Sequence, residues 1–292
     1  MIFPSRAGRS RSRSLLAFAA LSFAAAASCS EDDPGTGGAE AATSSSSTTA
    51  STGSGGDGTG NGGTGGAGTG AGGTGGGGDL SLLSDTFDGA ALDSSWTVYN
   101  PDLVDVSVAD GSLSLQPNQL ILWYQASEGV LAYKLVKGDF KVTSTVRARK
   151  VSTPADPPDD YVHLGGLMAR SPASDGVDAA EDYVFIVLGN DENDLSVETK
   201  ITEGSLSEYD GPPWPSGDAE LRICRVGATF NLYKRPVGAA VWEEAASFEA
   251  NLPDELQVGP NVYAATAAPD LQVSFSEVVF AAVTAGSDCT QD

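Results

Sequence analysis

The 292-residue sequence predicts an all-β domain over residues 79–284, built as a sandwich or a barrel. Short apolar runs recur there at regular spacing between clusters of Gly, Pro, Asn and Asp, which is typical of strands joined by turns. No window shows apolar residues at the helical period. About 200 residues are enough for one domain with a substantial core.

The first 28 residues predict an export signal. Arg6, Arg9, Arg11 and Arg13 form a basic region, and the apolar run Leu15–Ala27 follows it. That run is shorter than the roughly 20 residues that a membrane-spanning helix needs. A basic start, a short apolar run and small residues after it are the features of a signal peptide.

Cys29 follows directly on the small residues Ala26–Ser28, an arrangement that resembles a bacterial lipoprotein signal. The resemblance implies that Cys29 is lipidated and becomes the new N-terminus, so that the exported protein is anchored in the cell envelope. Ala26 departs from the pattern, which prefers Leu at that position. Ordinary cleavage near the same place is the alternative.

The stretch from Cys29 to residue 78 predicts a disordered tether. Residues 34–78 are almost wholly Gly, Ser, Thr and Ala and contain no aromatic residue, Leu, Ile or Val. Such a segment cannot bury enough apolar surface to offset the entropy of ordering it.

The charge of the chain disfavours nucleic acid as a partner. No acidic residue precedes Cys29, whereas four of the 16 basic residues do, so the chain from Cys29 onward carries 12 basic and 39 acidic residues, a formal charge of −27. It should repel nucleic acid and anionic lipid headgroups. The charge suits cations, neutral glycans or basic partners, or it serves only to solvate an exported surface.

The strands are predicted from alternation and from their turns. Residues 103–115 alternate on both sides of the turn Asp110-Gly111, and residues 140–149 alternate over their whole length. The expected strands are Leu103–Val108, Leu113–Leu115, Leu120–Tyr124, Val130–Val136, Phe140–Arg149, Val162–Arg170, Tyr183–Leu188, Leu195–Thr202, Leu221–Val226, Thr229–Lys234, Ala240–Phe248, Val258–Ala264 and Leu271–Phe280. Residues 285–292 are a short tail.

The stretch Ser84–Trp96 (SDTFDGAALDSSW) resembles the opening of concanavalin A-like jelly rolls. It is similar to laminarinase-type glycoside hydrolases and to the C-terminal accessory domains of beta-xylosidases. Further pieces follow in the same order: Asp110–Leu113, Gly138–Phe140, Gly165–Arg170, Leu221–Ile223, Trp242 and Phe275–Phe280. The resemblance implies a jelly-roll sandwich of two antiparallel sheets, one of them concave and often used to hold glycans.

Alternation then predicts which side chains face this groove. With Leu167 and Ala169 in the core, the groove receives Arg170, Tyr183, Phe185, Glu198, Lys200 and Arg222. Aromatic rings and charged hydrogen-bonding groups suit sugar recognition, although a salt-bridge ladder on an ordinary solvated sheet gives the same pattern. Trp214, in a Pro-rich loop, is either a sugar platform or a hydrophobic plug.

The sequence disfavours catalysis. The hydrolytic relatives carry Glu-x-Asp-x-Glu or Glu-x-Asp-x-x-Glu on a concave strand, but Lys200 stands where the next groove-facing carboxylate after Glu198 should be. His163 is the only histidine and lies within an expected strand, and no Gly-x-Ser-x-Gly motif is present. A zinc site of His and Cys is excluded because these ligands are too few.

Calcium and a disulfide are the remaining structural expectations. The resemblance implies a structural calcium where the first and last strands meet, which by position corresponds to Asp85 and Glu277. If Cys29 is lipidated, Cys224 and Cys289 remain as one pair in an oxidising compartment, either bonded or free. No cofactor is required.

We therefore expect a lipid-anchored, non-catalytic carbohydrate-binding module of the bacterial cell envelope, engaging a polysaccharide or glycoconjugate. One alternative is an envelope lipoprotein that meets a protein partner through its acidic face. A second alternative is a divergent glycan-processing enzyme, which would have two closely spaced carboxylates in the groove.

Overall fold

The computed structural model describes residues 79–123, 129–175, 179–192 and 194–292. The export signal (1–28), Cys29 and the tether up to residue 78 lie outside the described residues.

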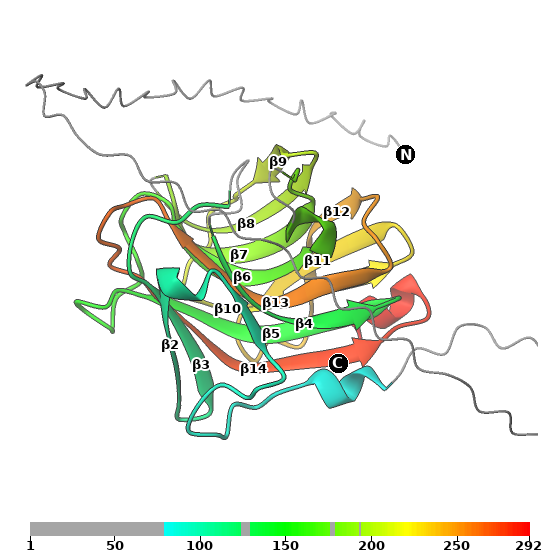
Figure 1. Ribbon diagram of the computed structural model, residues 1–292, viewed down its shortest axis with the longest axis horizontal. Helices are drawn as coiled ribbons and strands as arrows, with labels where there is room; N and C mark the ends of the chain where they lie inside the picture. The colour runs from blue at the N-terminus through cyan, green and yellow to red at the C-terminus, as the bar shows by residue number, and fades with distance from the viewer. Residues whose placement is uncertain (1–78, 124–128, 176–178, 193) are drawn as a thin grey trace, which may run out of the picture. The chain divides into compact units, whose positions relative to one another are not determined.

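Two antiparallel sheets of seven strands pack face to face in the described part of the chain (Figure 1). The first sheet contains, in spatial order, β1 (Thr97–Tyr99), β4 (Val130–Lys137), β13 (Glu255–Ala264), β6 (His163–Arg170), β7 (Tyr183–Asp191), β8 (Asp194–Glu203) and β9 (Leu206–Asp210). The second contains β12 (Glu243–Glu249), β11 (Thr229–Arg235), β10 (Asp218–Val226), β5 (Phe140–Arg149), β14 (Gln272–Ala282), β3 (Ser112–Pro117) and β2 (Val104–Ala109).

Helix is confined, among the described residues, to four short 3-10 segments: η1 (Leu80–Leu83), η2 (Pro101–Leu103), η3 (Pro172–Asp175) and η4 (Gly286–Thr290). The predicted all-β class is thus confirmed. No helix of the described chain has the length and apolar character needed to cross a membrane.

The core lies between the sheets and follows from alternation. In β5 every second residue from Phe140 to Ala148 is buried, as the period of a strand requires. The sheets approach closely at Gly165 of β6, where a Cβ would lie 2.8 Å from a methyl group of Val273 in β14. Burial of a large apolar side chain contributes about 1.5–3 kcal/mol, so the Phe and Leu residues of this layer dominate the stability of the domain.

The first sheet is also covered on its other side. All eight residues of β6 are buried, and so are the first eight of β7. A strand buried on both faces has contacts on the side away from the second sheet as well. We call that side the outer face of the first sheet, and it is where the sequence predicts the groove.

The expected strand Leu120–Tyr124 is wrong over its described residues. Ile121 makes only an isolated bridge with Ala264, and Trp123 packs on the outer face of the first sheet. Two strands were missed. β1 has three residues, and β9 is largely exposed, so neither has the apolar alternation that marks the others.

Candidate functional site

Five of the predicted groove residues share the outer face of the first sheet. In the strand register, Arg170 of β6 lies opposite Tyr183 of β7, and Phe185 of β7 lies opposite Lys200 of β8. Glu198 precedes Lys200 by two residues and therefore shares its face. The rings of Tyr183 and Phe185 stack with centroids 5.6 Å apart and planes 12° apart. The Lys200 Nζ lies 4.7 Å from the centre of the Phe185 ring.

Two cross-strand rows form the centre of this face. One row runs through Asn261, Gly166, Val187 and Glu198 on β13, β6, β7 and β8. Strands lie about 4.8 Å apart, so the backbones at its two ends are about 14 Å apart. The next row runs through Tyr263, Leu164, Gly189 and Ser196 on the same strands.

Glycine is required at two central positions of these rows. A Cβ at Gly166 would lie 2.2 Å from the carbonyl oxygen of Ile186, and one at Gly189 would lie 2.0 Å from that of His163. The backbones pack too closely there for any side chain. Each row thus has one position without a side chain, next to an apolar residue (Val187 or Leu164). We call the two glycine positions the glycine floor (Gly166 and Gly189).

Three buried polar atoms beside the glycine floor have no hydrogen-bond partner in the described chain: Asn261 Oδ1, Asn261 Nδ2 and Ser196 Oγ. Asn261 is fully buried and Ser196 is 1% exposed. Leaving a buried polar group unpaired costs about 1–3 kcal/mol. Unpaired groups of this kind are rare in folded chains and call for a specific explanation.

Glu198 and Lys200 form a buried ion pair at the same end of the face. Lys200 Nζ lies 3.1 Å from Glu198 Oε1, and the phenol of Tyr263 donates a hydrogen bond of 3.2 Å to that oxygen. Burial, and secondarily the charge of Glu198, raises the pKa of Tyr263 well above its ordinary value. Tyr263 therefore stays protonated and remains a donor.

Asp191 ends β7 on this face, two residues after Gly189. Burial raises its pKa to about 6, and the nearby carboxylates of Glu198 and Glu192 add to the effect. In the strand register Asp191 lies opposite Asp194 of β8. The Asp191 carboxyl group is partly withdrawn from water.

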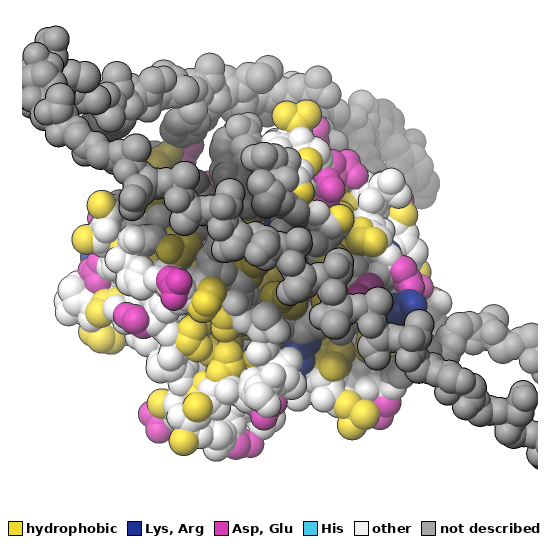
Figure 2. Space-filling view, in the orientation of Figure 1, with side chains coloured by type: hydrophobic (Ala, Val, Ile, Leu, Met, Phe, Trp, Pro, Cys, Tyr) yellow, Lys and Arg dark blue, Asp and Glu magenta, His cyan; other side chains and the backbone are white. Residues whose placement is uncertain are grey.

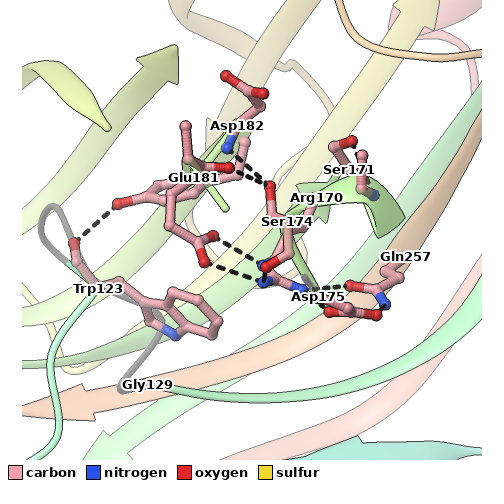
Figure 3. Close-up of polar contacts among 12 residues, drawn as sticks. Trp123, Gly129, Arg170, Ser171, Ser174, Asp175, Glu181, Asp182 and Gln257 are labelled. Carbon is pink, nitrogen blue, oxygen red and sulfur yellow. Dashed lines mark hydrogen bonds and ion pairs between the residues drawn. The ribbon is translucent and has the colours of Figure 1, made fainter. Parts of the chain in front are cut away.

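At the Arg170 end of the outer face, the buried guanidinium is surrounded by hydrogen-bond and ion-pair partners (Figure 3). Arg170 donates from Nε and Nη2 to the two oxygens of Glu181 at 2.8 and 2.9 Å, and from Nη1 to Gln257 Oε1 at 2.7 Å and to Asp175. Its guanidinium lies 4.5 Å from the centre of the Tyr99 ring. Burial lowers the pKa of Arg170, but the two carboxylates outweigh this effect and raise it overall.

Trp123 packs over this end. Its ring stacks on Tyr99 at 6.2 Å and meets Tyr183 edge-on at 5.8 Å. Its carbonyl oxygen accepts hydrogen bonds from the Tyr183 phenol at 2.9 Å and from Lys200 Nζ at 3.4 Å. The indole lies on the backbone of Gly129, where a Cβ would come within 2.2 Å of it.

Arg222 does not belong to this face, so its predicted place in the groove is wrong. It lies on β10, in the second sheet, and donates to Thr143 Oγ1 and to the carbonyl oxygen of Cys289. Alternation correctly placed it opposite to the buried Leu221 and Ile223. It could not tell which of the two sheets the strand joins.

Trp214 is a plug rather than a platform. Its side chain is only 9% exposed, and its indole N–H donates to the carbonyl oxygen of Asp218 at 3.0 Å. A stacking platform needs an open ring face, so of the two alternatives that the sequence left open for Trp214, the sugar platform is wrong and the plug is correct.

The C-terminal segment is fixed to the second sheet. Cys224 and Cys289 form a disulfide that joins β10 to η4. Arg222 and Arg235 each lie about 4 Å from the Trp242 ring, and both bind the Asp292 carboxylate. Hydrogen bonds from Arg235 and Trp242 lower the pKa of Asp292 to about 2.

The residues predicted for calcium are neighbours across strands. Asp85 bridges to Val278, next to Glu277. The Asp85 carboxylate accepts from the Phe87 N–H at 2.8 Å and from the Trp96 indole at 2.7 Å. No group of three or more His, Cys, Asp or Glu side chains able to hold a metal occurs in the described part of the chain, so calcium stays a prediction.

His163 is buried in β6 and is held by Thr266 Oγ1 and the Tyr161 carbonyl oxygen. It lies within a strand, as the sequence predicted.

Comparisons with solved structures assign the fold. The domain is similar to the GH43 protein BlXynB from Bacillus licheniformis (TM-score 0.54, 14% identity, 68% of this chain and 39% of that one). It is also similar to a functionally unknown protein from Saccharomyces cerevisiae (TM-score 0.53, 16% identity, 66% and 98%). The fold is the concanavalin A-like jelly roll.

A beta-1,3-glucanase from Mycobacterium marinum aligns at a TM-score of 0.44 with 14% identity over 70% of this chain and 99% of that one. The chain spans well under half the length of the GH43 protein. No family model matches the sequence, and no curated protein matches it significantly. Glycoside hydrolase-like proteins are thus among the structural neighbours, and at these identities the likeness concerns the fold alone.

Proposed function

We propose that this protein is a non-catalytic carbohydrate-binding module that holds a polysaccharide or glycoconjugate on the outer face of its first sheet. The observation that carries the proposal is the set of unpartnered polar atoms of Asn261 and Ser196, buried beside the aromatic and ionic groups of that face. Sugars present many hydroxyl groups on an apolar ring. A face that combines unpaired polar atoms with aromatic rings complements both features.

The ion pair supports binding without catalysis. Hydrolysis with retention uses two carboxyl groups about 5–5.5 Å apart, one as nucleophile and one as acid. On β8 the groove-facing partner of Glu198 is Lys200, and the two are bonded to each other at 3.1 Å. A carboxylate held by a lysine and a tyrosine is a fixed acceptor for sugar hydroxyls, and it is a poor nucleophile.

We also propose that lipidation of Cys29 anchors the module in the cell envelope and that residues 29–78 act as its tether. The support is the signal-like start of the sequence. In the bacterial host, Cys29→Ser should move the protein from the membrane fraction to the soluble fraction. A variant that stays in the membrane fraction contradicts the lipid anchor and leaves the binding proposal unaffected.

The binding proposal is tested with the full chain on a panel of soluble and insoluble polysaccharides. We expect retention on one glycan class, weakened about 5- to 10-fold by Ser196→Ala, since one hydrogen bond contributes about 1 kcal/mol. Ser247→Ala on β12 is the matched control, because that hydroxyl lies in the second sheet and binds Asn231.

Reducing ends are measured in the same incubations. Retention on no glycan overturns the proposal in favour of a protein partner. Accumulation of reducing ends, lost in Glu198→Gln, overturns its non-catalytic part.

A further inference from the structure

We infer that the site recognises an uncharged sugar at the end of a glycan, or a short oligosaccharide, rather than an internal stretch of a long chain. The inference rests on the proposed function and adds the class of ligand. Three observations support it. The polar groups of the site are buried, Trp123 packs on the other end of the same face, and the buried cations Arg170 and Lys200 are already paired with carboxylates.

The polar groups of the site are enclosed. Asn261, Ser196, Glu198 and Lys200 are between 0 and 4% exposed. An internal segment of a polysaccharide needs an open path on which the chain enters and leaves. Groups withdrawn this far from the surface suit a ligand that is taken up whole or by its tip, as most small-molecule sites do.

Trp123 fills the other end of the same face. Its ring packs between Tyr99 and Tyr183, and its carbonyl oxygen accepts hydrogen bonds from the Tyr183 hydroxyl and from Lys200 Nζ. A glycan chain that continued along the strands, from the Asn261–Glu198 row toward Arg170, would meet this indole. What remains is the row itself, about 14 Å between its outer strands.

Charge excludes acidic sugars. The buried cations of this face are already bound by carboxylates, Arg170 by Glu181 and Asp175, and Lys200 by Glu198. A uronate or sulfate would need a cation of its own, because removing its charge from water without a partner is costly. Acidic side chains also outnumber basic ones on the surface that Figure 2 shows, so the long-range field repels anions.

The Asn261 amide defines what the ligand must offer. Its Oδ1 accepts and its Nδ2 donates, and both are unpaired in the described chain. Two adjacent hydroxyl groups on one sugar ring supply a donor and an acceptor at matching spacing. The Ser196 hydroxyl and the Glu198 carboxylate lie across the glycine floor and would bind the other side of the ligand.

The test is calorimetric titration of the full chain with neutral methyl glycosides (glucoside, galactoside, mannoside and xyloside), with glucuronate and galacturonate, and with oligosaccharides from two to six units. We expect one neutral glycoside to bind. Its oligosaccharides should have a Kd, counted per chain end, within about threefold of that of the glycoside, because the added units lie outside the site. The uronates should not bind. Asn261→Leu should abolish binding, and Asn190→Leu should not.

Each other outcome is informative. Affinity that rises more than about tenfold from disaccharide to hexasaccharide means that an internal stretch is bound. Preferential binding of a uronate means that the charge argument is wrong. Either result overturns this inference and leaves the proposed function standing. If neither small sugars nor polysaccharides bind to the folded chain, the proposed function fails and this inference fails with it.

Discussion

Asn261→Leu separates a ligand site from an ordinary core more sharply than any other change in this domain. The substitution replaces a planar amide by an apolar side chain of similar volume on β13. In the wild type the amide is fully buried and both its polar atoms lack partners among the described residues. We therefore expect the variant to be more stable than the wild type, which is unusual for a change in a core strand.

The magnitude follows from two opposing effects. Removing an unsatisfied buried polar group gains about 1–3 kcal/mol. Fitting a branched side chain between Leu131 and Gly166, its cross-strand neighbours, costs up to about 1 kcal/mol. The net gain is about 1–2 kcal/mol in the free energy of unfolding. For a domain of this size that raises Tm by about 3–6 °C.

Thermal and urea unfolding of the full chain measure this gain, with Asn190→Leu as the matched control. Asn190 is 4% exposed, but its Nδ2 donates to the Asp160 carbonyl oxygen at 2.7 Å. Its replacement should lower stability by about 1–3 kcal/mol. If Asn261→Leu is destabilising to the same extent as the control, the amide has partners after all, and our reading of the site is refuted.

Three further changes test the rest of the structure. Arg170→Met should lower the free energy of unfolding by about 3–5 kcal/mol, because it leaves Glu181 buried without its partner. In urea titrations, adding Glu181→Gln should recover part of this loss. If the double variant recovers nothing, packing of Arg170 against Tyr99 matters more than its charge. Cys289→Ser should cost about 4 kcal/mol, since the disulfide to Cys224 closes a loop of 65 residues, and equal unfolding midpoints of the wild type with and without reductant would contradict this. Asp191→Asn should stabilise the domain by about 1–2 kcal/mol at pH 7.5 and hardly at pH 4. The folded-state pKa of this group, about 6, lies above its ordinary value, so the wild type keeps the full benefit of the protonated form only at low pH and loses it as the pH rises through 6; an equal gain at both pH values would refute the assignment.

Alternation made the strands and the faces predictable. Residues 140–149 were expected as one strand, and β5 has those bounds. The same reasoning placed Tyr183 and Phe185 on one face, and the register confirms that they lie beside Arg170 and Lys200. A period of two is a local property of the backbone, so a single sequence is enough to reveal it.

Sheet membership and unpaired polar groups could not be predicted in the same way. Alternation correctly predicted that Arg222 points away from the core, but its strand belongs to the second sheet and not to the first. The neighbours of a strand are set by long-range packing that its own sequence does not encode. Asn261 gave no signal, since one asparagine in an apolar run is indistinguishable from a satisfied core residue until its partners are known. Trp214 was open between two readings, and burial decided it.

The two ends of the outer face differ in how completely their buried polar groups have hydrogen-bond partners, and this difference is itself an argument for function. At one end Arg170 uses its guanidinium on Glu181, Asp175, Gln257 and the Ser174 carbonyl oxygen. That network shows that this chain can satisfy a buried cation on this face. The sheet nevertheless leaves Asn261 unpaired a few residues away. Sites that break the local rules of a fold are expected where a protein sacrifices stability for binding. The stabilising effect predicted for Asn261→Leu and the loss of sugar binding predicted for the same variant are two measurements of that one trade-off.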